Sequence, residues 1–553
     1  MKIFKNLLLG VSASVLVSEL LIASPIRAEE ATPPTEAAAP AETPAATATP
    51  APDVQDDAVL MAVRAKLAAE PAADEERDRK DHSALIEFYN ARHGEALWVM
   101  ASGLKPEAKT LATEIENADS YGLDKARFKL PERTNGDLTA TDTDALAAAE
   151  IQFSKAALLY ARDARGGRIP DPAGMLSTNL DRRPQWIEPK IVIDALAQTH
   201  EPDAYLRSLQ PQQPQFEKLR QIYLTMLSKD GKDGKPGQLS PAAKRIRANM
   251  EMWRWMWLNM GDFYVLNNIP EFMQYVYKDG QIIRSEKIVA GMLDKQSTIF
   301  SRPLKHVVLR PAWRVPESIM VNELWPNLIR GGGMMRQYGL QIRTKNTDKL
   351  VDYRSIDWST SDIRDYVVMQ PPGAKSVLGH VKFSFPSQHT IYMHDTPDKW
   401  MFKSAQRTLS HGCLRVQKPM QLAEMILKED KGWDAAKIAE LDRSGPLNNE
   451  ISIEKEIPIH LVYFTAWVGE DGKLKTFRDV YGHEKRITLA LDGKWEKISK
   501  GRDHLAPVEP SFNPAAVAAR SQNLNSDYPY GPPSKKKSAN VTDLIGNALG
   551  LSF

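Results

Sequence analysis

Apolar residues in the first half of the chain recur at the three- and four-residue intervals of amphipathic helices. The first stripe follows Pro106, and the two stripes consist of Ala108, Leu111, Ala112, Ile115 and Ala118, and of Leu146, Ala149, Phe153, Ala156 and Tyr160. A further helix is predicted after Ser240, whose hydroxyl can cap the first turn. We interpret these stripes as core faces and not as binding sites.

The pattern changes at Tyr264, where short runs typical of β-strands begin. Asp279-Gly280 separates two of these runs and is a strong hairpin signal, and Asp471-Gly472 marks another hairpin. One helix, from Pro419 to Leu427, interrupts the series. The predicted strands are 264–269, 272–277, 281–289, 306–309, 377–383, 390–394 and 460–468.

The chain of 553 residues is too long for a single core, so several packed units are expected. We predict an α+β, multidomain fold: a helical domain at 76–235 and a mainly β domain at 240–505. Within the second domain, residues 322–365 are polar and include three consecutive glycines, which is typical of a loop-rich lid insert. The Ala/Pro-rich segment 29–75 is predicted to be a disordered linker, and 511–553 a disordered tail.

Residues 1–28 have the layout of an export signal peptide. Lys2 and Lys5 precede a mostly apolar stretch, and Ala28 ends an imperfect cleavage site in which Ile26 is larger than usual. The alternative is an uncleaved membrane anchor. The sequence therefore predicts an exported protein.

Charge and cysteine content narrow the possible functions. A formal net charge of +2 gives no reason to expect nucleic-acid binding. Cys413 is the single cysteine, so it cannot form an internal disulfide in an oxidising compartment. It is either a buried inert residue or a thiol kept for chemistry.

The residues around Cys413 favour chemistry. A thiol attacks acyl carbons as the thiolate and needs a base nearby. His411, two residues away, is one candidate; the other is His394, which strand alternation places on the same face as Tyr392. Gly412 allows close backbone approach, so its N–H and that of Cys413 could point at a developing oxyanion.

The remaining histidines are interpreted as packing residues, namely His380, His389 and His460. Together with His394 and His411 they would alternatively suggest zinc. However, the sequence has no His-Glu-x-x-His motif and no cysteine pair. We therefore expect no metal and no cofactor.

Residues 410–413 are Ser-His-Gly-Cys, with His394 upstream and Arg415 after them. This arrangement resembles the signature of the L,D-transpeptidases, the YkuD-type catalytic domain. Further segments resemble the large periplasmic, YcbB-like subgroup with its helical scaffold domain. They are 88–89, 97–99, 121–124, 166–168, 253–255, 265–270, 371–373 and 391–397. The resemblance implies a periplasmic location in a Gram-negative envelope. Relatives of this size often carry a small peptidoglycan-binding module between the domains, and no clear version is found here.

The resemblance also implies a reaction. Cys413 would attack the carbonyl of the diaminopimelate residue of a tetrapeptide stem, and D-alanine would leave from a thioester enzyme. His394 would take the thiol proton and return it to the leaving amine, with the backbone carbonyl of Asp395 orienting its ring. The N–H groups of Gly412 and Cys413 would hold the oxyanion.

Other positions are implied to support or line the site. Tyr392, Ser410 and Arg415 would bind substrate, with Arg415 either gripping a donor carboxylate or forming a structural ion pair. His411 would support the loop by hydrogen bonding. The insert at 322–365 would cover the donor cleft.

The implied partners are peptidoglycan stems, a donor and an amine acceptor, joined in a 3→3 cross-link. The same chemistry would attach an envelope protein to the wall, or act as an L,D-carboxypeptidase with water as acceptor. A non-catalytic peptidoglycan-binding scaffold is the alternative of another class, and intact His394 and Cys413 argue against it. Carbapenems are expected to acylate the thiol.

Overall fold

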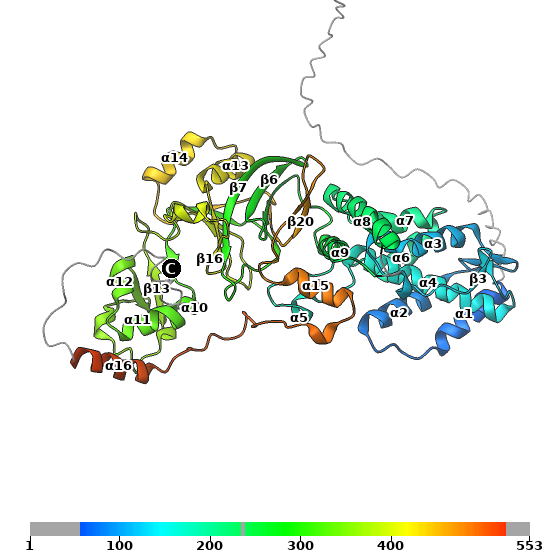
Figure 1. The fold of residues 1–553 in the computed structure, drawn as a ribbon, viewed down its shortest axis with the longest axis horizontal. Coiled ribbons are helices and arrows are strands. Elements are labelled where there is room, and N and C mark those ends of the chain that lie inside the picture. Colours follow the sequence, from blue (N-terminus) through cyan, green and yellow to red (C-terminus); the bar gives the residue numbers. More distant parts are fainter. Residues whose placement is uncertain (1–55, 234–237, 527–553) are drawn as a thin grey trace, which may run out of the picture. The chain divides into compact units, whose positions relative to one another are not determined.

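The computed structural model describes residues 56–233 and 238–526. The predicted signal peptide, the first part of the predicted linker and residues 527–553 of the predicted tail lie outside these ranges. No helix in the described part of the chain is long and apolar enough to cross a bilayer. A helical scaffold domain precedes a mainly β domain with a curled sheet (Figure 1), which confirms the predicted α+β, multidomain fold.

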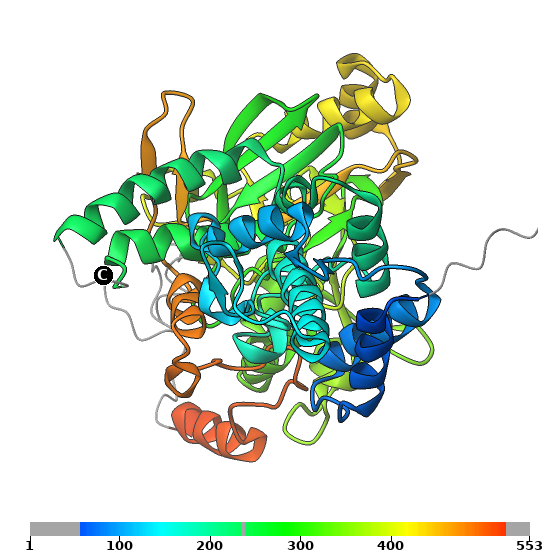
Figure 2. The same ribbon diagram turned by 90° about the vertical axis from the view of Figure 1, so that its right-hand side faces the viewer.

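The scaffold domain is built around α4 (Thr143–Gly166), whose predicted stripe is buried. Around it lie α1 (Ala58–Ala69), α2 (Glu76–Ala91), α3 (Pro106–Glu116), α6 (Pro189–Gln198) and α7 (Pro202–Ser208), with the small hairpins β1 (Val99–Met100)–β2 (Gly103–Leu104) and β3 (Arg133–Thr134)–β4 (Asp137–Leu138). The short helix α5 (Pro172–Met175) instead lies beside α15 (His483–Leu491) and packs with the core of the second domain (Figure 1). The long helices α8 (Pro214–Asp233) and α9 (Pro241–Arg254) pack together, as the teal and green helices of Figure 2 show. Ser240 caps α9 as predicted, accepting a hydrogen bond from the N–H of Ala243 at 3.3 Å.

Helix α1 corrects the predicted linker at 29–75, because residues 58–69 are folded onto the scaffold core. Leu60 and Val63 are fully buried, and Asp57 caps the helix by accepting from the N–H of Leu60 at 2.6 Å. The Ala/Pro-rich composition before this segment concealed its helical spacing of apolar residues. The linker prediction therefore fails from residue 56 onward.

The main sheet of the second domain has eleven strands in the order β18-β9-β14-β15-β17-β7-β6-β5-β19-β8, with β16 paired to β7. Its strands are β5 (Phe263–Asn268), β6 (Met273–Lys278), β7 (Gln281–Gly291), β8 (Ser301–Pro303), β9 (His306–Leu309), β14 (Val381–Ser384), β15 (Met393–His394), β16 (Thr408–Ser410), β17 (Leu414–Val416), β18 (Asn449–Ser452) and β19 (Pro458–Val462). Helices α13 (Pro419–Lys431), α14 (Ala435–Ser444) and α15 (His483–Leu491) and the hairpin β20 (Ala466–Val468)–β21 (Leu474–Thr476) accompany it.

Most predicted strands are present, and three differ. The predicted strand 377–383 begins only at Val381, because residues 377–380 form a turn. The hairpin at Asp279 and Gly280 is confirmed, with positive φ at both residues, as a tight turn of this kind requires. The predicted strand 390–394 shrinks to β15 because Thr390 adopts a left-handed φ of 52° that breaks the extended run. The predicted strand 460–468 is divided between β19 and β20.

The insert is more regular than the predicted loop-rich lid at 322–365. Residues 313–370, here called the lid, have a buried core of their own that includes Val321, Trp325 and Ile342. Its elements are β10 (Trp313–Arg314), α10 (Glu317–Ile319), a π-helical turn η3 (Met320–Leu324), α11 (Trp325–Ile329), α12 (Gly333–Tyr338), β11 (Gln341–Thr344), β12 (Leu350–Val351) and β13 (Tyr366–Gln370). Gly332 has a φ of 68° and lies against the ring of Tyr353, so it belongs to a fixed turn between α11 and α12.

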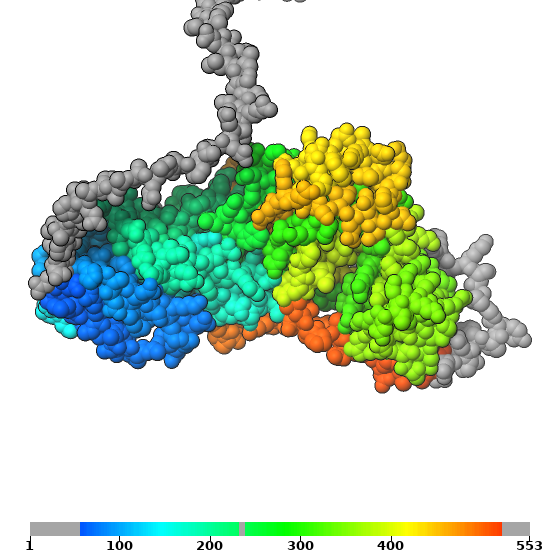
Figure 3. Space-filling view, turned by 180° about the vertical axis from the view of Figure 1, so that it is seen from behind, coloured from blue at the N-terminus to red at the C-terminus, as the bar shows by residue number. Residues whose placement is uncertain are grey.

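Residues 500–526, here called the C-terminal strap, reach the lid and correct the predicted disordered tail at 511–553. The strap ends in α16 (Pro514–Ser526), which packs beside α11, and Figure 3 shows its orange-to-red surface meeting the green lid. Phe512 contacts Trp325 edge-on, with ring centroids 5.6 Å apart. At the other end of the strap, His504 hydrogen-bonds to His389 at 2.8 Å. The packing of Phe512 on Trp325 and of α16 beside α11 thus holds this part of the predicted tail against the lid.

Gly167 ends α4 at the junction between the scaffold domain and α9. Its φ is 83° and its ψ is 170°, a conformation available almost only to glycine. Glu251 of α9 accepts hydrogen bonds from the N–H groups of Arg168 at 2.6 Å and Ile169 at 3.0 Å. A Cβ on Gly167 would lie only 2.6 Å from the Glu251 carboxylate.

We therefore expect Gly167→Ala to lower the free energy of unfolding by about 3 kcal/mol, from backbone strain and the displaced carboxylate. Gly136→Ala is the matched control, since Gly136 also has a positive φ of 82° but nothing within 4 Å of an added Cβ. The control should cost about 1 kcal/mol. Thermal or urea unfolding measures both, and equal losses would contradict the assignment.

Candidate active site

The predicted site residues meet at the beginnings of two short parallel strands. β15 pairs with β17 so that Met393 lies beside Leu414 and His394 beside Arg415. The N–H of Leu414 donates to the carbonyl of Tyr392 at 3.0 Å, which holds Cys413 next to Tyr392. The fold thus brings the predicted thiol and imidazole to neighbouring strands.

The loop before Cys413 is shaped by Ser410. Its hydroxyl accepts from the N–H of Gly412 at 3.2 Å and donates to the carbonyl of Cys413 at 2.6 Å. Gly412 has a φ of 112°, and its carbonyl accepts from the hydroxyl of Ser297 at 2.6 Å. These bonds form a tight internal network.

Two expectations about this loop therefore change. Ser410 is 2% exposed and binds the loop backbone, so it does not line the site as expected. The N–H of Gly412 is occupied by Ser410 and does not point at an oxyanion. The N–H of Cys413 has no hydrogen-bond acceptor among the described residues, and it alone remains of the two expected oxyanion donors.

The thiol of Cys413 is half-buried against Tyr392. Its Sγ lies 3.9 Å from the carbonyl oxygen of Thr390. Burial raises the pKa of Cys413 to about 11, although hydrogen bonding from Tyr392 and the charges of Lys382 and Arg415 act in the opposite direction. In the free protein the thiol is therefore protonated at neutral pH.

His394 is a buried neutral imidazole with a fixed orientation. Its Nδ1 is bonded to the backbone carbonyl of Asp395, the partner expected from the sequence. A carbonyl can only accept, so Nδ1 carries the proton and Nε2 is left as an acceptor. Burial, followed by the charge of Arg415, lowers the pKa of His394 to about 3. No hydrogen bond joins His394 to Cys413 in the described part of the chain.

The side chain of Asp395 fixes the turn after His394. It accepts from the N–H of His380 at 3.0 Å and from the N–H of Thr396 at 2.7 Å, and it pairs with Lys399. The contribution of Asp395 to the site is thus made through its backbone carbonyl, while its carboxylate supports the surrounding loop.

Arg415 shows the structural ion pair, one of the two roles considered for it. Its Nη1 lies 3.3 Å from the carboxylate of Asp398 and 3.2 Å from the hydroxyl of Thr396. The guanidinium is thereby anchored beside His394 instead of projecting freely toward a donor carboxylate.

Comparison with known families agrees with this geometry. A model of the YkuD family, described as the L,D-transpeptidase catalytic domain, matches residues 262–435. Residues 262–435 of this chain are thus similar to the catalytic domain of the L,D-transpeptidases. A second model, described as the scaffold domain, matches residues 83–222.

Individual relatives carry the same description. A curated protein of Haemophilus influenzae named "Putative L,D-transpeptidase" is 33% identical over 242 residues, which is 43% of this chain. The match spans about half, 48%, of that relative's length. Two solved structures, an L,D-transpeptidase from Mycobacterium smegmatis and the Ldtfm-avibactam carbamoyl enzyme, are 11% and 12% identical. They cover 36% and 37% of this chain and 58% and 50% of their own, each with a TM-score of 0.17, too low to support a structural argument.

The lid contacts the transpeptidase motif through residues that the sequence did not single out. Glu323 of η3 lies 2.9 Å from Nε2 of His411 and 2.5 Å from Nζ of Lys295. His411 thus supports the motif as expected, but its partner is the lid.

The other predicted packing histidines each have protein partners. His460 is fully buried between the hydroxyl of Ser301 at 2.7 Å and the carbonyl of Met260 at 3.2 Å. His389 bonds to Asp181 at 2.9 Å as well as to His504, and His380 lies 3.0 Å from Asp442. His389 and His460 are buried packing residues, as interpreted from the sequence, whereas His380 is exposed and forms a surface pair instead.

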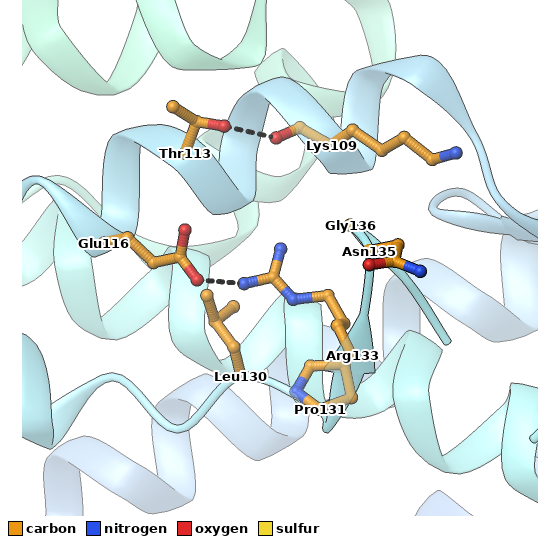
Figure 4. Close-up of a pocket in the computed structure, with 8 residues that line it drawn as sticks. All are labelled: Lys109, Thr113, Glu116, Leu130, Pro131, Arg133, Asn135 and Gly136. Atoms are coloured by element: carbon orange, nitrogen blue, oxygen red, sulfur yellow. Dashed lines mark hydrogen bonds and ion pairs between the residues drawn. The ribbon is translucent and has the colours of Figure 1, made fainter. Parts of the chain in front are cut away.

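A polar hollow of about 540 Å³ lies on the scaffold domain, outside the transpeptidase domain. Figure 4 shows Arg133 in this hollow directed at Glu116, with which it forms an ion pair. The second cation, Lys109, pairs with Asp137 at 2.6 Å. Both cations are thus neutralised within the domain, and the hollow gives no sign of a ligand.

The contact of Glu323 with His411 and Lys295 should hold the lid against the motif. Burial alone would raise the pKa of Glu323, but the hydrogen bond and charge of His411 and the charge of Lys295 outweigh it and hold the pKa at about 2. The pKa of Glu323 in the folded protein is thus below the ordinary value of 4.5. The ion pair therefore stabilises the closed lid above pH 4.5 and is lost as the pH falls through 2.

We expect Glu323→Gln to speed amide hydrogen exchange in residues 313–370 by about ten-fold at neutral pH, since a charge-assisted bond is lost. Glu317→Gln is the control, because Glu317 is an exposed lid carboxylate without an ion pair among the described residues. Unchanged lid exchange in Glu323→Gln would show that this contact does not hold the lid.

Proposed function

We propose that this protein is a periplasmic peptidoglycan L,D-transpeptidase that forms 3→3 cross-links. The observation that carries the proposal is the pairing of β15 with β17, which sets the single cysteine of an L,D-transpeptidase catalytic domain beside a neutral, oriented histidine. The apolar stretch at 7–22 after Lys2 and Lys5 supports export.

In the acylation step, Sγ of Cys413 attacks the carbonyl carbon of diaminopimelate in a tetrapeptide donor. Nε2 of His394 accepts the thiol proton as the sulfur–carbon bond forms. The N–H of Cys413 and the hydroxyl of Tyr392 are the donors available to the developing oxyanion. The carbon–nitrogen bond then breaks, and the imidazolium gives its proton to the departing D-alanine.

In the second step, an amine of an acceptor stem attacks the thioester. His394 takes a proton from the attacking amine and returns it to sulfur as the thiol leaves. The donor and acceptor stems are then joined, and the free enzyme is restored.

Muropeptide analysis of cells with and without the gene identifies the acceptor. We expect 3→3 dimers that depend on the gene. Dependence of a protein-linked muropeptide would instead indicate an envelope protein as acceptor, and dependence of a shortened stem would indicate water.

The activated thiol should be visible as a covalent adduct. We expect the full-length protein to gain the mass of one carbapenem molecule, and Cys413→Ala to gain nothing, because Cys413 is the single thiol. Intact-protein mass spectrometry measures both. A folded wild-type protein without an adduct would oppose the proposal, as would an adduct that persists in Cys413→Ala.

The pH dependence of thiol reactivity follows from the two pKa values. The pKa of Cys413 is raised to about 11 and that of His394 lowered to about 3, so neither group is charged between these limits in the free enzyme. The rate of iodoacetamide alkylation should therefore rise roughly ten-fold per pH unit from pH 6 to 10. A plateau below pH 8 would instead reveal a preformed thiolate–imidazolium pair.

A further inference from the structure

Lys382 is a cation beside the thiol to which the proposed reaction has given no task. It lies on β14, directly opposite His394 in the antiparallel pairing of β14 with β15, so the two side chains share one face of the sheet. Its Nζ lies 4.6 Å from the ring centroid of Tyr392. Its positive charge acts on both Cys413 and His394.

This lysine is also unpaired. Among the described residues no carboxylate lies within 4.0 Å of Lys382 and no hydrogen bond engages its ammonium group. The other cations around the motif are committed to acids: Arg415 to Asp398, Lys399 to Asp395 and Lys295 to Glu323. The site therefore contains one positive charge that is free to meet an anion.

The donor of the proposed reaction supplies such an anion at the matching place. When the attacked carbonyl reaches Sγ of Cys413, the departing residue follows it directly, and neighbouring Cα atoms are about 3.8 Å apart. If that residue ends the peptide, its free carboxylate must lie within a few ångströms of the thiol. A carboxylate taken out of water there needs a cation to offset its desolvation.

We propose that Lys382 binds the free carboxylate of the departing residue and thereby selects donors whose scissile bond is the last in the peptide. The inference rests on the proposed function and adds a specificity-determining residue to it. The carboxylate is present before and during attack, so its binding should act mainly on KM and less on kcat.

Two tetrapeptide donors test the inference, identical except that one ends in a carboxylate and the other in a primary amide. We expect the wild-type protein to prefer the carboxylate donor by about ten-fold or more in kcat/KM for release of the last residue, because a charge-assisted bond is lost with the amide. Lys382→Met should abolish this preference, chiefly through KM. Lys382→Arg should keep it.

Lys403→Met is the control, since Lys403 is exposed and has no ion pair among the described residues. It should keep the wild-type preference. The ratio of the two donors is measured within each variant, so a partly unfolded preparation does not alter it.

A Lys382→Met protein that slows both donors equally would overturn the inference while leaving the proposed function intact. A wild-type protein that accepts both donors equally would do the same. Release from neither donor by the wild-type protein would overturn the proposed function and this inference together.

Discussion

The short parallel pairing of β15 with β17 is the contact on which the site depends. It pairs residues twenty-one positions apart and places Tyr392, His394, Cys413 and Arg415 next to one another on two strands. Neither strand has more than three residues, so the sheet around them supplies the rigidity. Loss of this register would move the thiol and the imidazole to opposite faces.

Burial sets the chemistry of the site as strongly as geometry does. It keeps the thiol protonated and the imidazole neutral, so charge forms only when sulfur attacks a substrate. The two cations beside them differ in what they contribute. Arg415 is neutralised by Asp398, whereas Lys382 remains unpaired. In an oxidising compartment, a protonated thiol is oxidised more slowly than a thiolate.

The sequence predicts most of what depends on rare residues or on local pattern. Cys413 is the single cysteine and His394 lies in an alternating strand, so both could be identified without coordinates. Contacts between distant segments could not. Glu323 meets His411 across 88 positions of the chain, and no local signal shows that Lys382 stays unpaired. Helix α1 was missed because the composition of its neighbours outweighed its spacing.

The C-terminal strap limits the distance that the lid can move from the body of the protein. His504 is held in the body of the protein, and Phe512 is held on Trp325 of the lid. The eight residue-to-residue steps from 504 to 512 span at most about 28 Å when fully extended. While both contacts hold, the strap limits how far the lid can move from the body of the protein. The site can therefore open only within that distance.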